Sequence, residues 1–155
     1  MIIKSSAFEN NEMIPELYTC DGQNMNPPLE FSDVPEEAKS LVLIMDDPDV
    51  PKEVLEEQMY DHWVMFNTPP QTKMIPEGET IGVLGNNSSG KNRYTGPCPP
   101  PQYEPTTHRY FFKLYALDTE LELGAGSSKK DVLEAIDGHV IEEAELVGLY
   151  DRSES

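Results

Sequence analysis

Ionisable side chains stand at the ends of three apolar segments, and they are the residues best suited to chemistry. Two of the three histidines, His62 and His108, each begin such a segment, and the acidic stretch Asp46–Asp49 ends another. If these ends converge, imidazoles, carboxylates and the guanidinium of Arg109 form the polar floor of a small-ligand pocket. Imidazoles supply N–H donors whose charge is tunable near neutral pH, which suits a phosphate or carboxylate ligand.

Carboxylates beside an anion site need their own explanation, because their charge opposes that of the ligand. Asp47 or Asp49 accepting a hydrogen bond from one histidine would orient its ring and favour its protonated form. The second ring nitrogen would then face the ligand. Arg109 alternates away from Tyr110 along an extended chain, so we interpret Arg109 as a structural brace.

The same residue types permit other chemistry. His62, His108 and Asp47 could ligate iron or another divalent metal and make the chain a metal-dependent enzyme, although the histidines lack a metal-type spacing. Cys98, which lies among prolines, could act as a nucleophile, but no flanking signature supports this. A further hypothesis is a protease-inhibitor-like interaction module in which the loop Gly90–Pro105 engages a partner.

Three buried strands are predicted to position these residues. Ser40–Met45 is an apolar run too short for a helix, and His62–Asn67 is a second, stopped by Thr-Pro-Pro. His108–Leu117 is longer and rich in aromatic residues, which fits a central strand. Glu145–Tyr150 is a candidate final strand. The sequence therefore predicts a mainly β domain, an antiparallel β-sandwich with short peripheral helices.

Two helices and a long loop complete the expected organisation. Ser128–Asp131 resembles a capping box, and Gly138 follows the apolar stripe behind it as a helix stop. A shorter helix is expected over Lys52–Met59. Residues 68–107 are rich in proline and in turn-forming residues, and irregular segments of this length are often functional.

Composition bounds the size, the partners and the location. The 155 residues suffice for one domain, which we place at residues 1–152, with a disordered tail at 153–155. A net charge of −18 argues against nucleic-acid and anionic-membrane binding. No apolar run is long enough to span a bilayer and no secretory signal is evident, so we expect a cytoplasmic protein. There, Cys20 and Cys98 are predicted to be free thiols, without a structural zinc site.

Short motifs, in order along the chain, resemble the phosphatidylethanolamine-binding protein family, and most of all its bacterial and archaeal Raf-kinase-inhibitor-like branch. They are Cys20-Asp21-Gly22, Asn26-Pro27-Pro28-Leu29, Asp46-Asp47-Pro48-Asp49-Val50-Pro51, Tyr94-Thr95-Gly96-Pro97-Cys98-Pro99-Pro100 and His108-Arg109-Tyr110. Each motif is short, but together they are collinear over nearly the whole chain. Thr106 departs from the family's usual glycine, and Asn87–Gly90 departs from its usual Asn-Asp-Phe-Gly, which affects the rim of the pocket more than its floor.

The resemblance implies a β-sandwich with a small anion-binding pocket at one edge. The ligand-binding residues would be two bracing or lining carboxylates, two imidazoles, a tyrosine wall and a rim, namely Asp47, Asp49, His62, His108, Tyr110, Gly96 and Pro97. By this analogy the chain is a non-catalytic binder of a phosphate, a phospholipid headgroup or a carboxylate, and it needs no cofactor. The analogy also implies a homodimer that regulates a kinase or protease partner.

Overall fold

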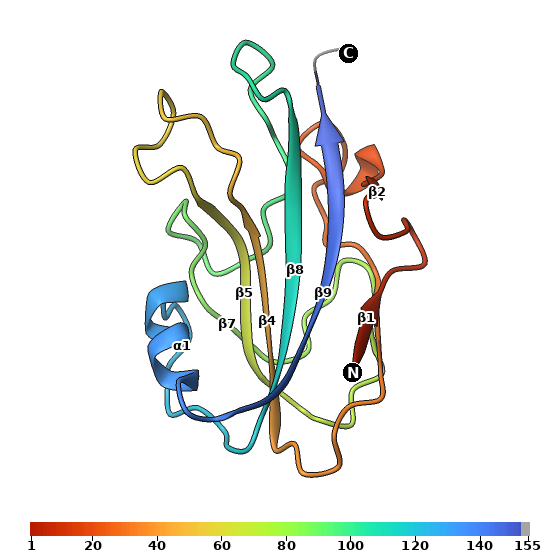
Figure 1. Ribbon diagram of the computed structural model, residues 1–155, viewed down its shortest axis with the longest axis vertical. Coiled ribbons are helices and arrows are strands. Elements are labelled where there is room, and N and C mark those ends of the chain that lie inside the picture. Colours follow the sequence, from red (N-terminus) through yellow and green to blue (C-terminus); the bar gives the residue numbers. More distant parts are fainter. Residues whose placement is uncertain (153–155) are drawn as a thin grey trace.

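The computed structural model describes residues 1–152, and strands dominate it (Figure 1). The strands are β1 (Ile2–Lys4), β2 (Glu12–Met13), β3 (Leu29–Ser32), β4 (Ser40–Asp47), β5 (Tyr60–Thr68), β6 (Met74–Ile75), β7 (Val83–Leu84), β8 (Thr107–Leu117) and β9 (Val140–Asp151). The helical elements of this part of the chain are a 3-10 turn, η1 (Glu16–Tyr18), and one α-helix, α1 (Lys129–Ile136). The mainly β fold class is confirmed, and the predicted tail at 153–155 lies outside the described residues.

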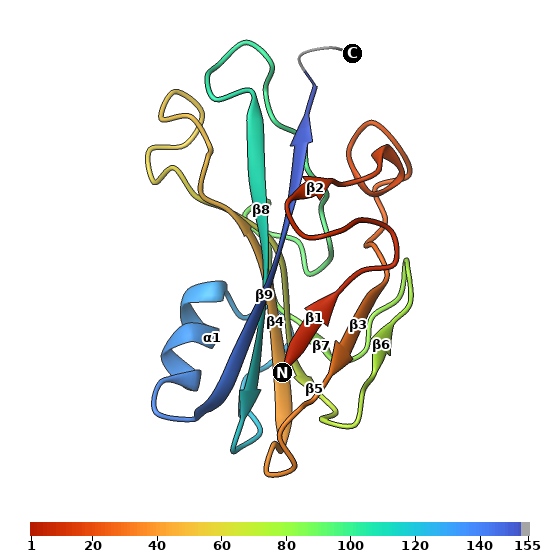
Figure 2. The ribbon, with the colours of Figure 1, turned by 45° about the vertical axis from the view of Figure 1, so that its right-hand side comes forward.

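The strands form two sheets that pack face to face. The larger sheet has the order β2-β9-β8-β4-β5-β7 and the smaller has the order β1-β3-β6. Figure 2 shows the smaller sheet on one side of the larger and α1 on the other. Pairing is antiparallel except where β2 runs parallel to β9, which a two-residue strand gave no pattern to predict.

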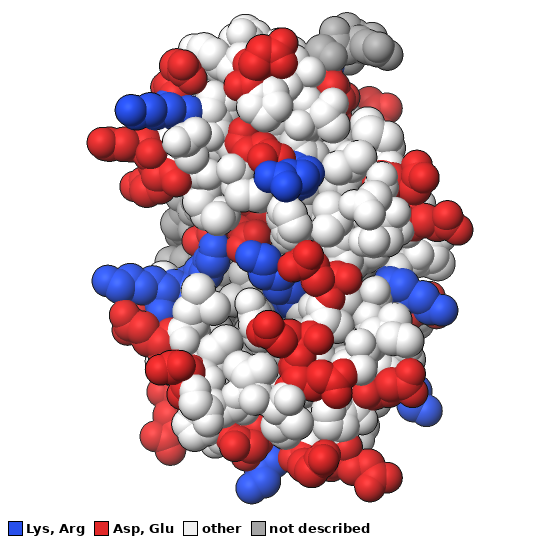
Figure 3. All heavy atoms as spheres, in the orientation of Figure 1, with Lys and Arg blue, Asp and Glu red and all other residues white. Residues whose placement is uncertain are grey.

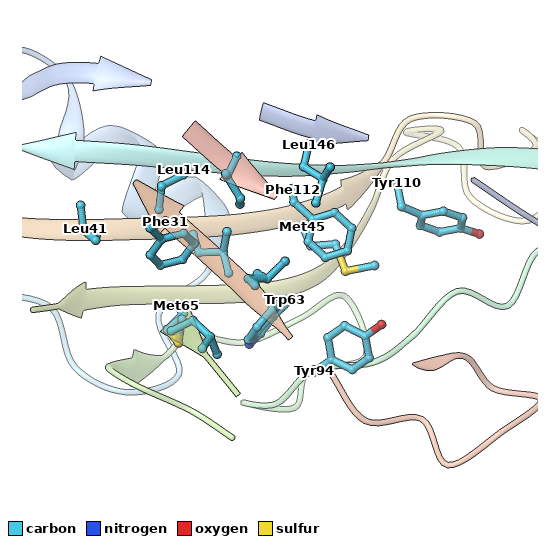
Figure 4. Packing of buried hydrophobic residues seen from close by; sticks show 14 of the residues in the cluster. Phe31, Leu41, Met45, Trp63, Met65, Tyr94, Tyr110, Phe112, Leu114 and Leu146 are labelled. Carbon is cyan, nitrogen blue, oxygen red and sulfur yellow. The ribbon is translucent and has the colours of Figure 1, made fainter. Parts of the chain in front are cut away.

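β4 is buried on both faces because its alternating side chains point into two different packed layers. Leu43 and Met45 enter the core between the sheets, whereas Val42 and Ile44 pack beneath α1. A strand covered on both sides reads as a continuous apolar run, which is why it was recognisable in the sequence. Figure 4 shows the inter-sheet cluster, with Tyr94 and Tyr110 at one end of it.

The predicted strands are confirmed, and each extends further than its apolar run.

The last two residues of β4, Asp46 and Asp47, point to opposite faces of the larger sheet because side chains alternate along a strand. Asp46 faces α1, where its fully buried carboxylate forms ion pairs with Lys129 Nζ at 2.8 Å and Lys113 Nζ at 3.2 Å. Asp47 points to the opposite face, toward the inter-sheet core. The neighbouring carboxylates of Asp46 and Asp47 therefore have partners on opposite faces of the larger sheet.

One predicted helix is confirmed and the other is wrong. Ser128 Oγ accepts from the Asp131 amide and the Asp131 carboxylate accepts from Ser128 N, which is the expected capping box of α1. The segment Lys52–Met59 instead forms turns. A helix of two turns needs an apolar face buried by tertiary contacts, and Val54 in this segment is 49% exposed.

The prediction of free thiols is also wrong, because Cys20 and Cys98 form a disulfide with an Sγ–Sγ distance of 2.08 Å. The two cysteines are separated by 78 positions, and only the folded arrangement brings their segments together. Disulfides are typical of oxidising compartments, so the cytoplasmic location remains a prediction. None of the helices within residues 1–152 is both long enough and apolar enough to cross a membrane.

Candidate functional site

A small cavity lies where β4 ends and where β5 and β8 begin. Antiparallel pairing of β4 with both neighbours brings these three strand termini to one end of the larger sheet, as Figure 1 shows. The cavity measures about 190 Å³, below the roughly 300–1,000 Å³ of drug-sized sites, so it suits a small group. It is lined by Asp47, Val50, Val54, Tyr60, His62, Thr95, Gly96, Cys98, Pro99, Pro100, His108 and Tyr110.

The structure brings together five of the seven residues that the sequence nominated for ligand binding, namely Asp47, His62, Gly96, His108 and Tyr110. Asp49 and Pro97 do not line the cavity. Asp49 braces β8 from outside, and the Pro97 carbonyl accepts a hydrogen bond from Cys20 N at 3.1 Å. The end of β4 and the beginnings of β5 and β8 therefore meet at the cavity, as predicted.

Asp47 holds the ring of His108. His108 Nδ1 donates to Asp47 Oδ2 at 2.7 Å, and the two side chains are only 1% and 4% exposed. Asp47 Oδ1 accepts from Asp49 N at 2.7 Å, so both carboxylate oxygens are engaged. His108 Nε2 is buried without a hydrogen-bond partner among the described residues. This nitrogen is free to contact a guest in the cavity.

Tyr110 stands two positions after His108 on β8, and the alternation of the strand places both side chains on one face. Their rings stack with centroids 6.3 Å apart. The Tyr110 hydroxyl is buried and lies near enough to Asp47 for this carboxylate to act on it, but no contact within residues 1–152 has the distance and angles of a hydrogen bond to this hydroxyl. Burial, reinforced by the carboxylate of Asp47, raises the pKa of Tyr110, so the hydroxyl keeps its proton and can donate it.

His62 approaches the cavity from β5. Its Nδ1 donates to the carbonyl of Thr95 at 2.6 Å, and its ring packs between Tyr60 and Tyr110 at centroid distances of 4.6 and 5.2 Å. Burial lowers the pKa of His62, and the bond to Thr95 and the charge of Asp47 offset this only in part. The ring is therefore neutral near pH 7, which differs from the charged imidazole expected beside a carboxylate.

Asp49 and Arg109 form a clasp on the outer side of the site. The Asp49 carboxylate accepts from the Arg109 amide and Nε at 2.9 Å and from Nη2 at 2.8 Å. Burial opposes ionisation of Asp49, but the hydrogen bonds from Arg109 outweigh it and lower the pKa of Asp49. This geometry agrees with the interpretation of Arg109 as a brace.

Thr95, Gly96 and Cys98 line the cavity, and we call the segment that carries them, residues 94–98, the anchored wall. This wall is tied to residues 17–24 by Tyr94 Oη to Tyr18 O at 2.7 Å, Gly96 N to Asn24 Oδ1 at 2.7 Å, Cys20 N to Pro97 O at 3.1 Å and the Cys20–Cys98 disulfide. A Cβ on Gly96 would lie 2.2 Å from Tyr18 O. Glycine is therefore required here by close packing of two backbone segments.

Sequence reasoning nominated seven residues for ligand binding and left out several others that line the cavity. Five of these stand in the motifs quoted above, namely Val50, Thr95, Cys98, Pro99 and Pro100, whereas Val54 and Tyr60 do not. Tyr60 precedes His62 by two positions, so an extended strand places both on one face. Thr95 contributes its backbone carbonyl, which no residue pattern reveals. Of the two departures from the family pattern, Asn87 supports Thr95 through a 2.9 Å bond to Oγ1, and Thr106 bonds to Asp151 away from the lining.

The surface is strongly acidic, as its composition of 29 acidic and 11 basic residues requires. Figure 3 shows acidic side chains spread over the face it presents, with lysines and arginines interspersed and no extended basic stripe on that face. Long-range charge therefore opposes an anion. At physiological ionic strength charges more than about 8 Å apart are largely screened, so donors inside the cavity dominate.

Two packed sheets with a buried His–Asp–Tyr cavity at the strand ends define a small β-protein with a ligand-sized polar site. The chain belongs to the phosphatidylethanolamine-binding protein family, whose model matches residues 4–151. This confirms the resemblance seen in the motifs.

Relatives and solved structures match along almost the entire chain. A UPF0098 protein of Methanothermobacter thermautotrophicus is 50% identical, over 98% of this chain and 99% of its own. A crystal structure of a phosphatidylethanolamine-binding protein homologue from Chlamydia trachomatis superposes with a TM-score of 0.92 at 46% identity, covering 97% of both chains. Escherichia coli YbcL, described as a member of the mammalian family, gives 0.85 at 27% identity, again over 97% of both chains.

Proposed function

We propose that this protein is a non-catalytic binding protein that holds a small anionic group, such as a phosphate, a phosphoryl headgroup or a carboxylate, in the cavity between His62 and His108. One observation carries the proposal. His108 Nε2 and the Tyr110 hydroxyl are both buried and both lack a partner among the described residues, in a cavity that they line together. Buried polar atoms are nearly always hydrogen-bonded, so a ligand is the natural partner.

The donors fit an oxyanion. The Tyr110 hydroxyl keeps its proton, and a protonated His108, paired with Asp47, would donate from Nε2. The phosphoryl ligand implied by the family name agrees with this donor set. Affinity is expected to be modest, because the net charge of −18 opposes an anionic ligand and is screened only in part.

Titration calorimetry at pH 6 tests the proposal with inorganic phosphate and phosphoethanolamine as ligands. Wild type should bind, and His108→Ala should bind about tenfold or more weakly, as expected for loss of a charged hydrogen bond. His139→Ala is a matched control, since His139 pairs with exposed Asp118 outside the cavity lining. Equal binding by all three proteins, or no binding at pH 6, would overturn the proposal.

The alternatives gain less support from the geometry. Within residues 1–152 no group of three or more His, Cys, Asp or Glu side chains is arranged to hold a metal ion. Elemental analysis of the purified protein, with a hydrolase or oxygenase assay, tests the metal-dependent enzyme directly. The kinase or protease partner and the homodimer rest on family analogy. The interaction module rests on the proline-rich loop Gly90–Pro105, and deletion of this loop tests it. Analytical ultracentrifugation tests the homodimer.

A further inference from the structure

The Cys20–Cys98 disulfide lies at the surface of the molecule and also at the cavity. Cys98 is one of the residues that line the cavity, and both cysteines of the bridge are exposed to solvent. The rate of thiol–disulfide exchange depends on whether a thiolate can reach a sulfur of the bridge. A thiol in solution can therefore attack a bridge that shapes the candidate site.

The segment that follows the bridge, residues 99–105, has few bonds of its own. It supplies two prolines to the cavity lining, Pro99 and Pro100. Within residues 1–152 its only hydrogen bond is local, from Tyr103 N to Pro100 O at 3.5 Å. Four of its seven residues are prolines, which lack an N–H donor. The position of this segment therefore depends strongly on how its two ends are held.

The disulfide holds one of these ends. At the other end, Thr106 Oγ1 donates to Asp151 Oδ2 at 3.1 Å. The hydrogen bonds of the anchored wall reach only as far as the carbonyl of Pro97, so the bridge is the last tie before residues 99–105. Reduction would leave the hydrogen bonds of residues 94–97 in place and release the chain from Cys98 onward.

We propose that the Cys20–Cys98 disulfide is a thiol-exchange site that controls the cavity, so that the oxidised protein binds the anionic group more tightly than the reduced protein. The inference rests on the proposed function and adds regulation of that site. A thiolate attacks one sulfur of the bridge and releases the other cysteine as a thiolate, and a second thiol resolves the mixed disulfide. In total, two thiols lose two electrons and become a disulfide, and the two cysteines gain these electrons and two protons.

The order of the lining explains the direction of the effect. In the oxidised protein Cys98, Pro99 and Pro100 are already in place. A ligand that binds the reduced protein must order these residues at the same time, and the lost conformational entropy reduces its affinity. Because linkage is reciprocal, a bound ligand should make the bridge harder to reduce by the same factor.

Calorimetry at pH 6 with phosphoethanolamine as the probe compares oxidised wild type, wild type reduced with dithiothreitol, and the double variant Cys20→Ser/Cys98→Ser. We expect the reduced protein and the double variant to bind about tenfold or more weakly than oxidised wild type. The double variant is the control for the reductant, since dithiothreitol should not change its affinity. Equal affinity of oxidised and reduced wild type would overturn the regulation and leave the proposed function standing. Absence of binding by all three proteins would overturn both.

Circular dichroism separates a released cavity segment from a lost fold. Reduced wild type should keep its β-sheet spectrum under the conditions of the calorimetry and unfold at a lower temperature than oxidised wild type. Loss of the folded spectrum on reduction would overturn the proposal, because the bridge would then support the whole fold and not the cavity in particular.

A redox titration of wild type measures the coupling in the other direction. The protein is equilibrated with mixtures of reduced and oxidised dithiothreitol and alkylated, and mass spectrometry gives the oxidised fraction. Phosphoethanolamine at a concentration that saturates both forms should raise the midpoint ratio of reduced to oxidised dithiothreitol about tenfold. Sodium chloride at the same ionic strength should leave the ratio unchanged. A bridge that resists dithiothreitol in the folded protein, or a midpoint that phosphoethanolamine does not shift, would overturn the proposal.

Discussion

Two segments that line the cavity differ in how they are held in the fold. The anchored wall, residues 94–98, is held by bonds to residues 17–24, and these ties span 78, 76 and 72 positions of sequence. A second lining segment, residues 50–59, contributes Val50 and Val54, and we call it the turn wall. Its backbone bonds are local, from Val54 N and Leu55 N to Pro51 O and from Gln58 N to Leu55 O.

This difference indicates which lining segment can change its position when a ligand enters the cavity. Segments with few long-range bonds open at lower free energy than segments tied into the core. We therefore expect the turn wall to move when a ligand enters and the anchored wall to keep its position. The predictions below test this contrast, from the largest expected effect to the smallest.

Removing the disulfide should have the largest effect. Replacing Cys20 and Cys98 by serine frees a loop of 78 positions, and the loop-entropy relation gives a loss of about 4.5 kcal/mol in the free energy of unfolding. Urea denaturation of wild type and the double variant measures this loss. Added reductant should destabilise wild type and leave the double variant unchanged. A loss below about 1 kcal/mol would show that the hydrogen bonds alone anchor this wall.

Gly96→Ala tests the close approach within the anchored wall. The new Cβ would lie 2.2 Å from Tyr18 O and 2.6 Å from Asn24 Oδ1, so backbone must shift. Overpacking of this kind costs about 1–3 kcal/mol, measured by urea or thermal unfolding. Gly124→Ala is the control, because a Cβ there meets nothing within 4 Å. Equal stability of the two variants would contradict the tight contact.

The Asp49–Arg109 clasp should contribute less, and its contribution should depend on pH. The pKa of Asp49 is lowered in the folded protein, so the stabilisation is present above the unfolded value of about 3.9 and is lost as pH falls through the folded value. Arg109 is 54% exposed, and solvent screening limits the effect to about 1 kcal/mol or less.

Urea denaturation of Asp49→Asn should therefore show a loss at pH 7 that disappears once wild-type Asp49 is itself protonated. Asp118→Asn, which alters an exposed carboxylate paired with His139, is the control and should change stability less at pH 7. A loss of the same size at both pH values would argue against an electrostatic origin.

Substitution in the turn wall should have the smallest effect on stability. Val54→Ser alters a side chain that is half exposed, and we expect a change below about 0.5 kcal/mol. Hydrogen exchange followed by mass spectrometry then compares the two walls directly. Amides of residues 52–58 should exchange faster than the amide of Gly96, which is bonded to Asn24. Equal protection of the two segments would remove the contrast.

The long strands and the residue types of the cavity were predictable from sequence for a physical reason. β4 is buried on both faces and β8 alternates between buried and more exposed positions, so each leaves a distinct apolar pattern. Polar residues at the ends of such runs are conspicuous, and His62 and His108 were identified in this way. Antiparallel neighbours then place those ends together.

The features that sequence reasoning missed depend on tertiary contacts. The Cys20–Cys98 pairing requires two segments to meet across 78 positions, and no local pattern reveals such a meeting. Lys52–Met59 has a composition compatible with a helix, but no apolar face there is covered by the core. The separate tasks of Asp47 and Asp49 follow from which carboxylate reaches His108 and which reaches Arg109.

The split of Asp46 and Asp47 between two faces makes β4 intolerant of length changes. Side chains alternate along the strand, so a slip of one position against β8 would exchange the two faces. The carboxylate of Asp46 would then face the inter-sheet core and lose Lys129, and the carboxylate of Asp47 would face α1 and lose His108. A single inserted or deleted residue within this strand would thus break both the Asp46–Lys129 contact with α1 and the Asp47–His108 pair of the cavity. Length variation among homologues is accordingly expected in the connecting segments and not in this strand.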